Sequence, residues 1–174
     1  EKSRAIGQNI TLGHCRMLAG RDKLQQLRFD DALPLLDEAL ELFEKTGDRD
    51  DIVEALSWRT LALAELSDTD EAEAAAERAT SIYDEIKCEY LLPHLGLARG
   101  VAAESDPGAA ITILEEALRT SEEMQTAETT WMIQREIARL HAATGDIPRA
   151  GRFYKDAVET IKGITETIPD EETK

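Results

Sequence analysis

The chain is poor in the residues that mark disulfide-rich, membrane-spanning or β-sheet proteins. Of its 174 residues, two are cysteine, ten glycine, five proline and only 5% aromatic. Cys15 and Cys88 have no motif spacing, which is typical of reduced, partly buried thiols in a cytoplasmic protein. No apolar run approaches the ~18 residues that a transmembrane helix needs. No short stretch alternates β-branched and polar side chains, so we expect no strand.

Positive charge is also scarce. The chain has 36 Asp and Glu against 20 Lys and Arg, which gives a net charge of -16. Such a body repels phosphate, so we expect neither a nucleic acid nor a membrane surface as its partner. Hydrophobic residues make up 42% of the chain, too many for a disordered acidic tail. The chain begins without Met or an apolar signal region, and we expect residues 1–174 to be one domain of a longer polypeptide.

The sequence lacks the motifs of the common enzyme and metal sites. It contains no GxxxxGK[ST], GxGxxG, HExxH or CxxC pattern. His14 and Cys15 are neighbours on an expected helix, so their side chains point in different directions. Paired carboxylates such as Glu115-Glu116 are typical of solvated helix surface in a chain this acidic. We therefore expect no enzyme activity, no catalytic residue, no metal site and no cofactor.

An internal repeat is the strongest signal in the sequence. Four segments align without gaps: 29–40, 69–80, 107–118 and 147–158. Each has an alanine at its fourth position and a second alanine seven residues later, and the period is 38–40 residues. The first alanines are Ala32, Ala72, Ala110 and Ala150, and the second are Ala39, Ala79, Ala117 and Ala157.

The alanine spacing predicts closely packed helices. Positions seven apart lie on one helical face, and small side chains there let a second helix approach. A larger residue stands between the alanines in three segments, Leu36, Leu114 and Tyr154, whereas Ala76 is the exception. A turn precedes each segment, and another amphipathic stretch precedes each turn, at roughly 4–27, 50–66, 90–104 and 127–144. The pattern predicts an all-α fold of paired antiparallel helices.

These features resemble the tetratricopeptide repeat family. In the fourth repeat Ile137-Ala138, Gly145-Asp146, Ala150, Tyr154 and Ala157 stand at the family's spacing, and the likeness covers residues 14–161. The period exceeds the family's usual ~34 residues, as it does in bacterial multidomain regulators and kinesin light chains. The resemblance implies an α-solenoid of about four helix pairs in a right-handed superhelix. The expected repeats are residues 4–46, 50–87, 90–123 and 127–168.

The resemblance also implies a function. It suggests a non-catalytic scaffold for protein–protein contact, binding a peptide or protein on its concave face within a cytoplasmic multidomain regulator. The alternative is an effector-sensing domain that binds a small ligand and relays a conformational change to attached domains. The scarcity of aromatic residues favours a peptide over a small molecule.

In that family the first helix of each pair lines the groove that takes the ligand. Eleven residues before the first alanine, three of the four repeats have an arginine: Arg21, Arg99 and Arg139. Arg135 lies one helical turn before Arg139. We expect this surface to bind carboxylates of an acidic partner, with adaptable apolar residues beside it. The alternative is that the arginines pair with neighbouring glutamates. The candidate residues are Met17, Arg21, Trp58, Leu95, Arg99, Met132, Arg135 and Arg139.

Both ends of the array carry apolar residues that a solenoid would leave uncovered. Ile6, Ile10 and Met17 lie on the first helix, and Ile161, Ile164 and Ile168 lie on the last. These residues either fold back on the terminal pairs or are covered by a further helix or a second copy. Self-association through the terminal helices is therefore a possible interaction.

Overall fold

The helices follow the predicted stretches closely. The computed structural model describes the backbone of residues 2–166 and the side chains of residues 6–166. This part of the chain contains α-helices and one 3-10 turn, and no strand. The elements are α1 (Lys2–Gln25), α2 (Phe29–Thr46), α3 (Arg49–Glu65), α4 (Thr69–Ile86), η1 (Glu89–Leu91), α5 (Leu92–Ala102), α6 (Pro107–Glu123), α7 (Ala127–Ala143) and α8 (Ile147–Glu166).

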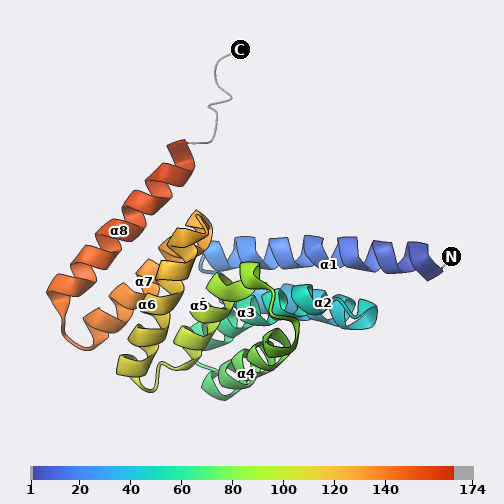
Figure 1. Ribbon diagram of the computed structural model, residues 1–174, viewed down its shortest axis with the longest axis horizontal. Coiled ribbons are helices and arrows are strands. Elements are labelled where there is room, and N and C mark those ends of the chain that lie inside the picture. Colours follow the sequence, from blue (N-terminus) through green and yellow to red (C-terminus); the bar gives the residue numbers. More distant parts are fainter. Residues whose placement is uncertain (1, 167–174) are drawn as a thin grey trace, which may run out of the picture.

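Consecutive helices form four pairs, and each pair stacks on the next (Figure 1). Helices α1, α3, α5 and α7 contact one another along the stack and form its inner, concave layer. Helices α2, α4, α6 and α8 form the outer layer. The all-α solenoid predicted from the sequence is confirmed.

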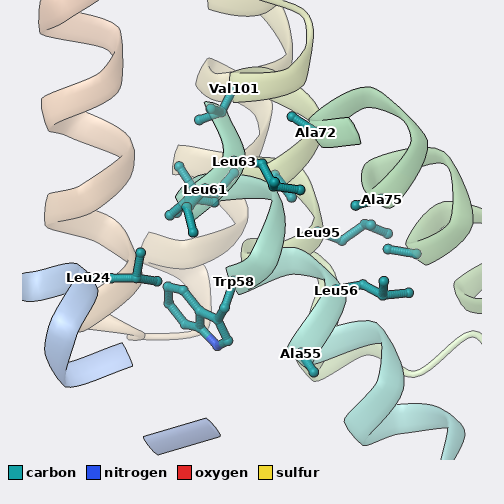
Figure 2. Packing of buried hydrophobic residues seen from close by; sticks show 14 of the residues in the cluster. Leu24, Ala55, Leu56, Trp58, Leu61, Leu63, Ala72, Ala75, Leu95 and Val101 are labelled. Carbon is teal, nitrogen blue, oxygen red and sulfur yellow. The ribbon is translucent and has the colours of Figure 1, made fainter. Parts of the chain in front are cut away.

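The repeating register of small and large residues builds the core. Leu36 and Leu114 are fully buried, and so are the flanking alanines of the first and third pairs. Small residues on the facing helix make room for them, because a Cβ added at Gly20 would collide with Leu36. The core around α3 contains Trp58, Leu61 and Leu95, among others, and Figure 2 shows Trp58 on the side of Leu24 in α1.

Turn residues end and begin the helices as their chemistry predicts. Gly47 adopts a left-handed φ of 76° and donates its N–H to the carbonyl of Phe43 at 2.8 Å, which ends α2. The Asp106 carboxylate accepts hydrogen bonds from the N–H groups of Gly108 and Ala109 and so caps α6.

The third pair differs from the others in its turn. Residues 103–106 join α5 to α6, whereas three residues suffice in the other three pairs: 26–28, 66–68 and 144–146. Gly96 and Gly100 let α6 lie close to α5, because a Cβ at either position would collide with Ala117 or Leu114.

The terminal helices present uncovered apolar side chains. On α8, Tyr154 is 43% exposed, although the same register position is buried in the other pairs. The expected small–large–small stripe is therefore wrong for Tyr154, because among the described residues α8 packs only on α7. Ile161 is also exposed and Ile164 is half-buried, while Ile168 lies outside the described residues. On α1, Ile6 is exposed and Ile10 half-buried, whereas Met17 is 3% exposed, so the expectation of an uncovered side chain is wrong for Met17, which packs in the core. The Cys15 thiol is exposed rather than partly buried.

Candidate binding surface on the concave face

The concave layer brings three of the four predicted arginines to the inner surface. Arg21 of α1 lies between α3 and α7. It forms ion pairs with Glu54, at 3.5 Å, and with Glu128. Its guanidinium lies 4.9 Å from the ring centroid of Trp58, close enough for a cation–π contact. Gln25, one turn further along α1, also donates to Glu128, so the start of α7 is tied to the end of α1.

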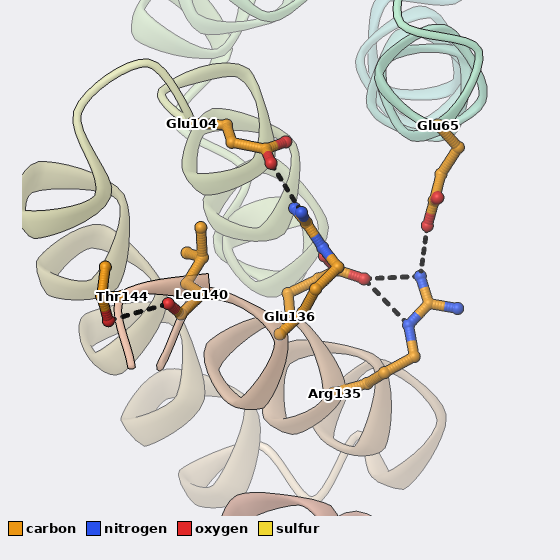
Figure 3. Close-up of polar contacts among 7 residues, drawn as sticks. Glu65, Glu104, Arg135, Glu136, Leu140 and Thr144 are labelled. Carbon is orange, nitrogen blue, oxygen red and sulfur yellow. Dashed lines mark hydrogen bonds and ion pairs between the residues drawn. The ribbon is translucent and has the colours of Figure 1, made fainter. Parts of the chain in front are cut away.

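Arg135 and Arg139 of α7 hold a buried carboxylate between them (Figure 3). The Glu136 side chain is only 3% exposed and accepts hydrogen bonds from the guanidinium groups of both arginines. Arg135 reaches across the concave face to Glu65 of α3 at 3.0 Å, and Arg139 reaches Glu104, just beyond α5, at 2.6 Å. These five side chains form a continuous network, which we call the concave ion cluster.

The concave ion cluster borders a polar cavity of about 310 Å³ between α3, α5 and α7. Burial raises the pKa of the Glu65 carboxyl, and the nearby Glu136 raises it further. The hydrogen bond to Glu104 raises the pKa of Arg139, which therefore keeps its charge. The cavity is lined by Leu61, Ala64, Glu65, Ser67, Thr69, Val101, Glu104, Arg135, Glu136 and Arg139.

Carboxylates outnumber arginines on this surface. Each of the three arginines is already paired with at least two carboxylate groups of the chain itself. The interpretation in which arginines pair with neighbouring glutamates therefore describes the ground state of the concave face. The carboxylates are Glu54, Glu65, Glu104, Glu128 and Glu136.

The four predicted apolar companions lie in the core rather than on the surface. Met17, Trp58, Leu95 and Met132 are 2–3% exposed. Trp58 is covered on one side by the His94 ring at 5.1 Å, and His94 in turn meets the Thr129 hydroxyl at 3.2 Å. This side of the concave face is thus filled by the chain's own residues. That these residues contact a partner stays a prediction.

Arg99 lies apart from the other arginines. Its side chain is exposed and borders a groove between α4 and α6, on the outer side of α5. The extra residue in the turn between α5 and α6 explains the difference. One additional residue rotates a position by about 100° around the helix axis, so counting back across this turn selects another face.

A scan against protein-family models gives a match for the first two helix pairs. Residues 14–85 match the tetratricopeptide repeat model. The first two helix pairs therefore carry the tetratricopeptide repeat pattern. No curated protein sequence matches the chain significantly.

Solved structures share the fold over most of the chain. One is a signal transduction ATPase with numerous domains (a STAND protein) with a tetratricopeptide repeat sensor, from Pyrococcus horikoshii. It is 17% identical, with a TM-score of 0.64, and the match covers 89% of this chain. The chain spans only 24% of that protein's length. At this identity the likeness concerns the fold alone.

The concave carboxylates did not enter the sequence prediction, although a signal for three of them was present. Glu54 and Glu65 are eleven residues apart, and so are Glu128 and Arg139. Positions eleven apart lie on one face of a helix, three turns from each other. The helix period thus places three of the five carboxylate partners: Glu54 and Glu65 share one face of α3, and Glu128 shares a face of α7 with Arg139.

Other chemistry is sparse in the part of the chain that the structure describes. No three His, Cys, Asp or Glu side chains there come together as a possible metal-binding group. His141 stacks on Phe153 at 5.8 Å, as expected of a packing residue. None of the helices searched is long and apolar enough to span a bilayer.

Proposed function

We propose that this chain is a non-catalytic interaction scaffold that binds a peptide or partner protein on its concave face. Tetratricopeptide repeats are generally protein-interaction modules, and the structural neighbour is a multidomain protein. We further propose that residues 1–174 form one repeat domain of a longer, cytoplasmic regulator. The observation that carries the proposal is the concave ion cluster, with its polar cavity of about 310 Å³.

The network suggests how an acidic partner would bind. A partner carboxylate would bind Arg135 and Arg139 by displacing Glu65 and Glu104, while the buried Glu136 keeps both arginines oriented. The Glu65 and Glu104 side chains are 29% and 44% exposed, so both can turn into solvent at low cost. A basic group would instead bind these two carboxylates and displace the arginines. Binding of either kind exchanges one ion pair for another, so it should weaken with added salt.

The experiment uses peptides selected from a random phage-displayed library on the immobilised chain. In the variant Glu65→Gln/Glu104→Gln both arginines lose one carboxylate, and acidic peptides should bind at least about tenfold more tightly. A matched control is Glu122→Gln/Glu123→Gln at the end of α6, which should change nothing. Peptides that bind the concave variant and the control with equal affinity would contradict a concave site. If basic peptides bind the parent chain more strongly than acidic ones, and the concave variant no longer binds them, the partner is basic rather than acidic.

A second candidate function is effector sensing. The STAND protein is described as carrying a tetratricopeptide repeat sensor, and the cavity at the concave ion cluster is large enough for a small polar ligand. A metabolite library screened by thermal shift would separate the two functions. A small molecule that raises Tm in a concentration-dependent way would favour sensing if the same molecule no longer raises Tm in the variant Arg135→Gln.

We also propose self-association through the terminal helices. Support comes from the exposed apolar residues at both ends of the stack, which include Ile6, Leu12 and Leu18 on α1 and Tyr154 and Val158 on α8. Sedimentation velocity over a wide concentration range tests this. A strict monomer at high concentration would contradict it.

A further inference from the structure

The outer surface of the second repeat has a groove that the sequence pattern explains. It lies between α4 and α6, above α5, and has a volume of about 500 Å³. Ala76 stands here at the register position that Leu36 and Leu114 occupy in the first and third pairs. The smaller side chain leaves the space open. The remaining floor is formed by Ala102, Ala103 and Ile113.

One wall of this groove is acidic. Glu73, Glu77 and Asp84 line it from α4, at positions that share one helical face. Among the described residues Glu73 and Glu77 form no ion pair, while Asp84 pairs with Lys87 at 2.6 Å. Both unpaired carboxylates are exposed. The groove therefore combines an apolar floor with unsatisfied negative charge.

Helix α8 has an apolar face bordered by positive charge, which complements the apolar floor and acidic wall of the groove. Its exposed face carries Tyr154, Val158 and Ile161, which are 43%, 49% and 38% exposed. Val158 and Ile161 stand at the register positions of Leu40 and Phe43, and Phe43 is fully buried in the first pair. The face is thus the one by which an outer helix packs in this fold.

Basic residues border this apolar face. Lys155 and Lys162 lie beside it on α8 and are both exposed. The ion pair of Lys155 with Glu159 is long, at 3.7 Å, and its partners are 75% and 62% exposed, so it is readily exchanged.

We propose that α8 of a second copy of this chain docks in the groove between α4 and α6. The proposal rests on the self-association proposed above and specifies its surfaces. Lys155 and Lys162 are seven residues apart, and so are Glu77 and Asp84, so both pairs are separated by about 10.5 Å along their helices. Tyr154 and Val158 would cover the alanine floor.

The chain's own α8 does not occupy the groove. It packs on α7 at the end of the stack, away from α4 (Figure 1). A helix that fills the groove must carry apolar residues with lysines beside them, and among the described helices α8 exposes that combination.

Charge exchange between the two surfaces tests the proposal. The groove variant is Glu77→Lys/Asp84→Lys and the helix variant is Lys155→Glu/Lys162→Glu. Each variant alone should raise the dissociation constant of self-association at least about tenfold in sedimentation velocity, because like charges then face one another. An equimolar mixture should restore association, since the basic groove accepts the acidic helix and the reverse. All four positions are exposed, and circular dichroism spectra should confirm that both variants fold.

The outcomes separate this inference from the self-association proposal. A chain that stays monomeric at every concentration contradicts both. Association that both variants retain contradicts the groove and leaves self-association in place, through α8–α8 or α1 contacts. Failure of the mixture to associate, after each variant has lost association, also contradicts pairing of these two surfaces.

Discussion

Arg21 on α1 and Glu128 on α7 form an ion pair although 107 residues separate them in the chain. The first and fourth repeats therefore meet across the concave face, and the stack is strongly curved. The Trp58 ring lies beneath the Arg21 guanidinium at 4.9 Å, so α3 supports the contact from below. This contact closes one side of the concave face and leaves the cavity at Arg135 and Arg139 as its open part.

The Arg21–Glu128 pair should couple the two ends of the stack measurably. The side chains are 18% and 40% exposed, so solvent screens the pair only in part. In a double-mutant cycle of Arg21→Gln and Glu128→Gln, we expect a coupling free energy of about 1 kcal/mol from urea denaturation. The same cycle on Lys155 and Glu159, which are highly exposed, should give no coupling. Equal coupling in both cycles would mean that the repeats do not meet as described.

The repeated large position should matter for stability in the first and third repeats but not in the fourth. Leu36→Ala and Leu114→Ala remove fully buried side chains, so each should lower the free energy of unfolding by about 2–5 kcal/mol. Tyr154→Ala at the same register position should cost much less, because Tyr154 is 43% exposed. Chemical denaturation of the three variants checks this. A large loss for Tyr154→Ala at low protein concentration would show that α8 is covered within the monomer.

The sequence carries enough information for the fold because the alanine register is local. Ala32 and Ala39 lie on one helix, and their spacing alone selects the packed face. The burial of the apolar face of α8 was harder to predict from the sequence. Tyr154 fits the pattern, yet a pattern cannot tell whether another helix follows to cover the face.

Two glycine-to-alanine substitutions should change the stability of the fold in opposite directions. Gly96→Ala should destabilise the chain by about 1–3 kcal/mol, because the new Cβ would lie 2.5 Å from the Cβ of Ala117. Gly151→Ala should stabilise it by about 0.5–1 kcal/mol, because Gly151 lies in α8 with nothing within 4 Å of an added Cβ. Thermal unfolding of the two variants measures both effects. A stabilised Gly96→Ala would mean that α5 and α6 are further apart.

Acid should weaken the fold through His94. Burial lowers the pKa of this imidazole below its ordinary value of 6.5; Arg21 lowers it further, while the carboxylates of Glu54 and Glu128 oppose the shift. The unfolded chain then binds a proton that the folded chain does not, so the free energy of unfolding falls as the pH drops below about 6.5. Glu65 and Asp51 act in the opposite direction, because their raised pKa values make the folded chain bind protons first.

The variant His94→Gln isolates this contribution, since it keeps a hydrogen-bonding group for Thr129 and no longer titrates. The urea midpoint should fall less between about pH 7.5 and about pH 5.5 in the variant than in the parent chain. Identical pH profiles for His94→Gln and the parent chain would show that His94 is accessible to protons in the folded state.

The concave site was only partly predictable, for a physical reason. Counting back from the alanines finds Arg21 and Arg139 because the turns after α1 and α7 have equal length. It misplaces Arg99, because the turn after α5 is one residue longer. The pairing of Arg21 with Glu128 depends on the curvature of the whole stack, which sums small rotations between repeats and leaves no local trace in the sequence.

The closure of the concave face can be tested by chemical cross-linking. In a background carrying Cys15→Ser and Cys88→Ser, the substitutions Arg21→Cys and Glu128→Cys place thiols on α1 and α7. A short bis-maleimide should then join the two within one molecule. The yield should be far above that of a control pair, Gln8→Cys near the start of α1 with Lys155→Cys in the middle of α8. A yield no higher than that control would contradict a stack whose first and fourth repeats meet.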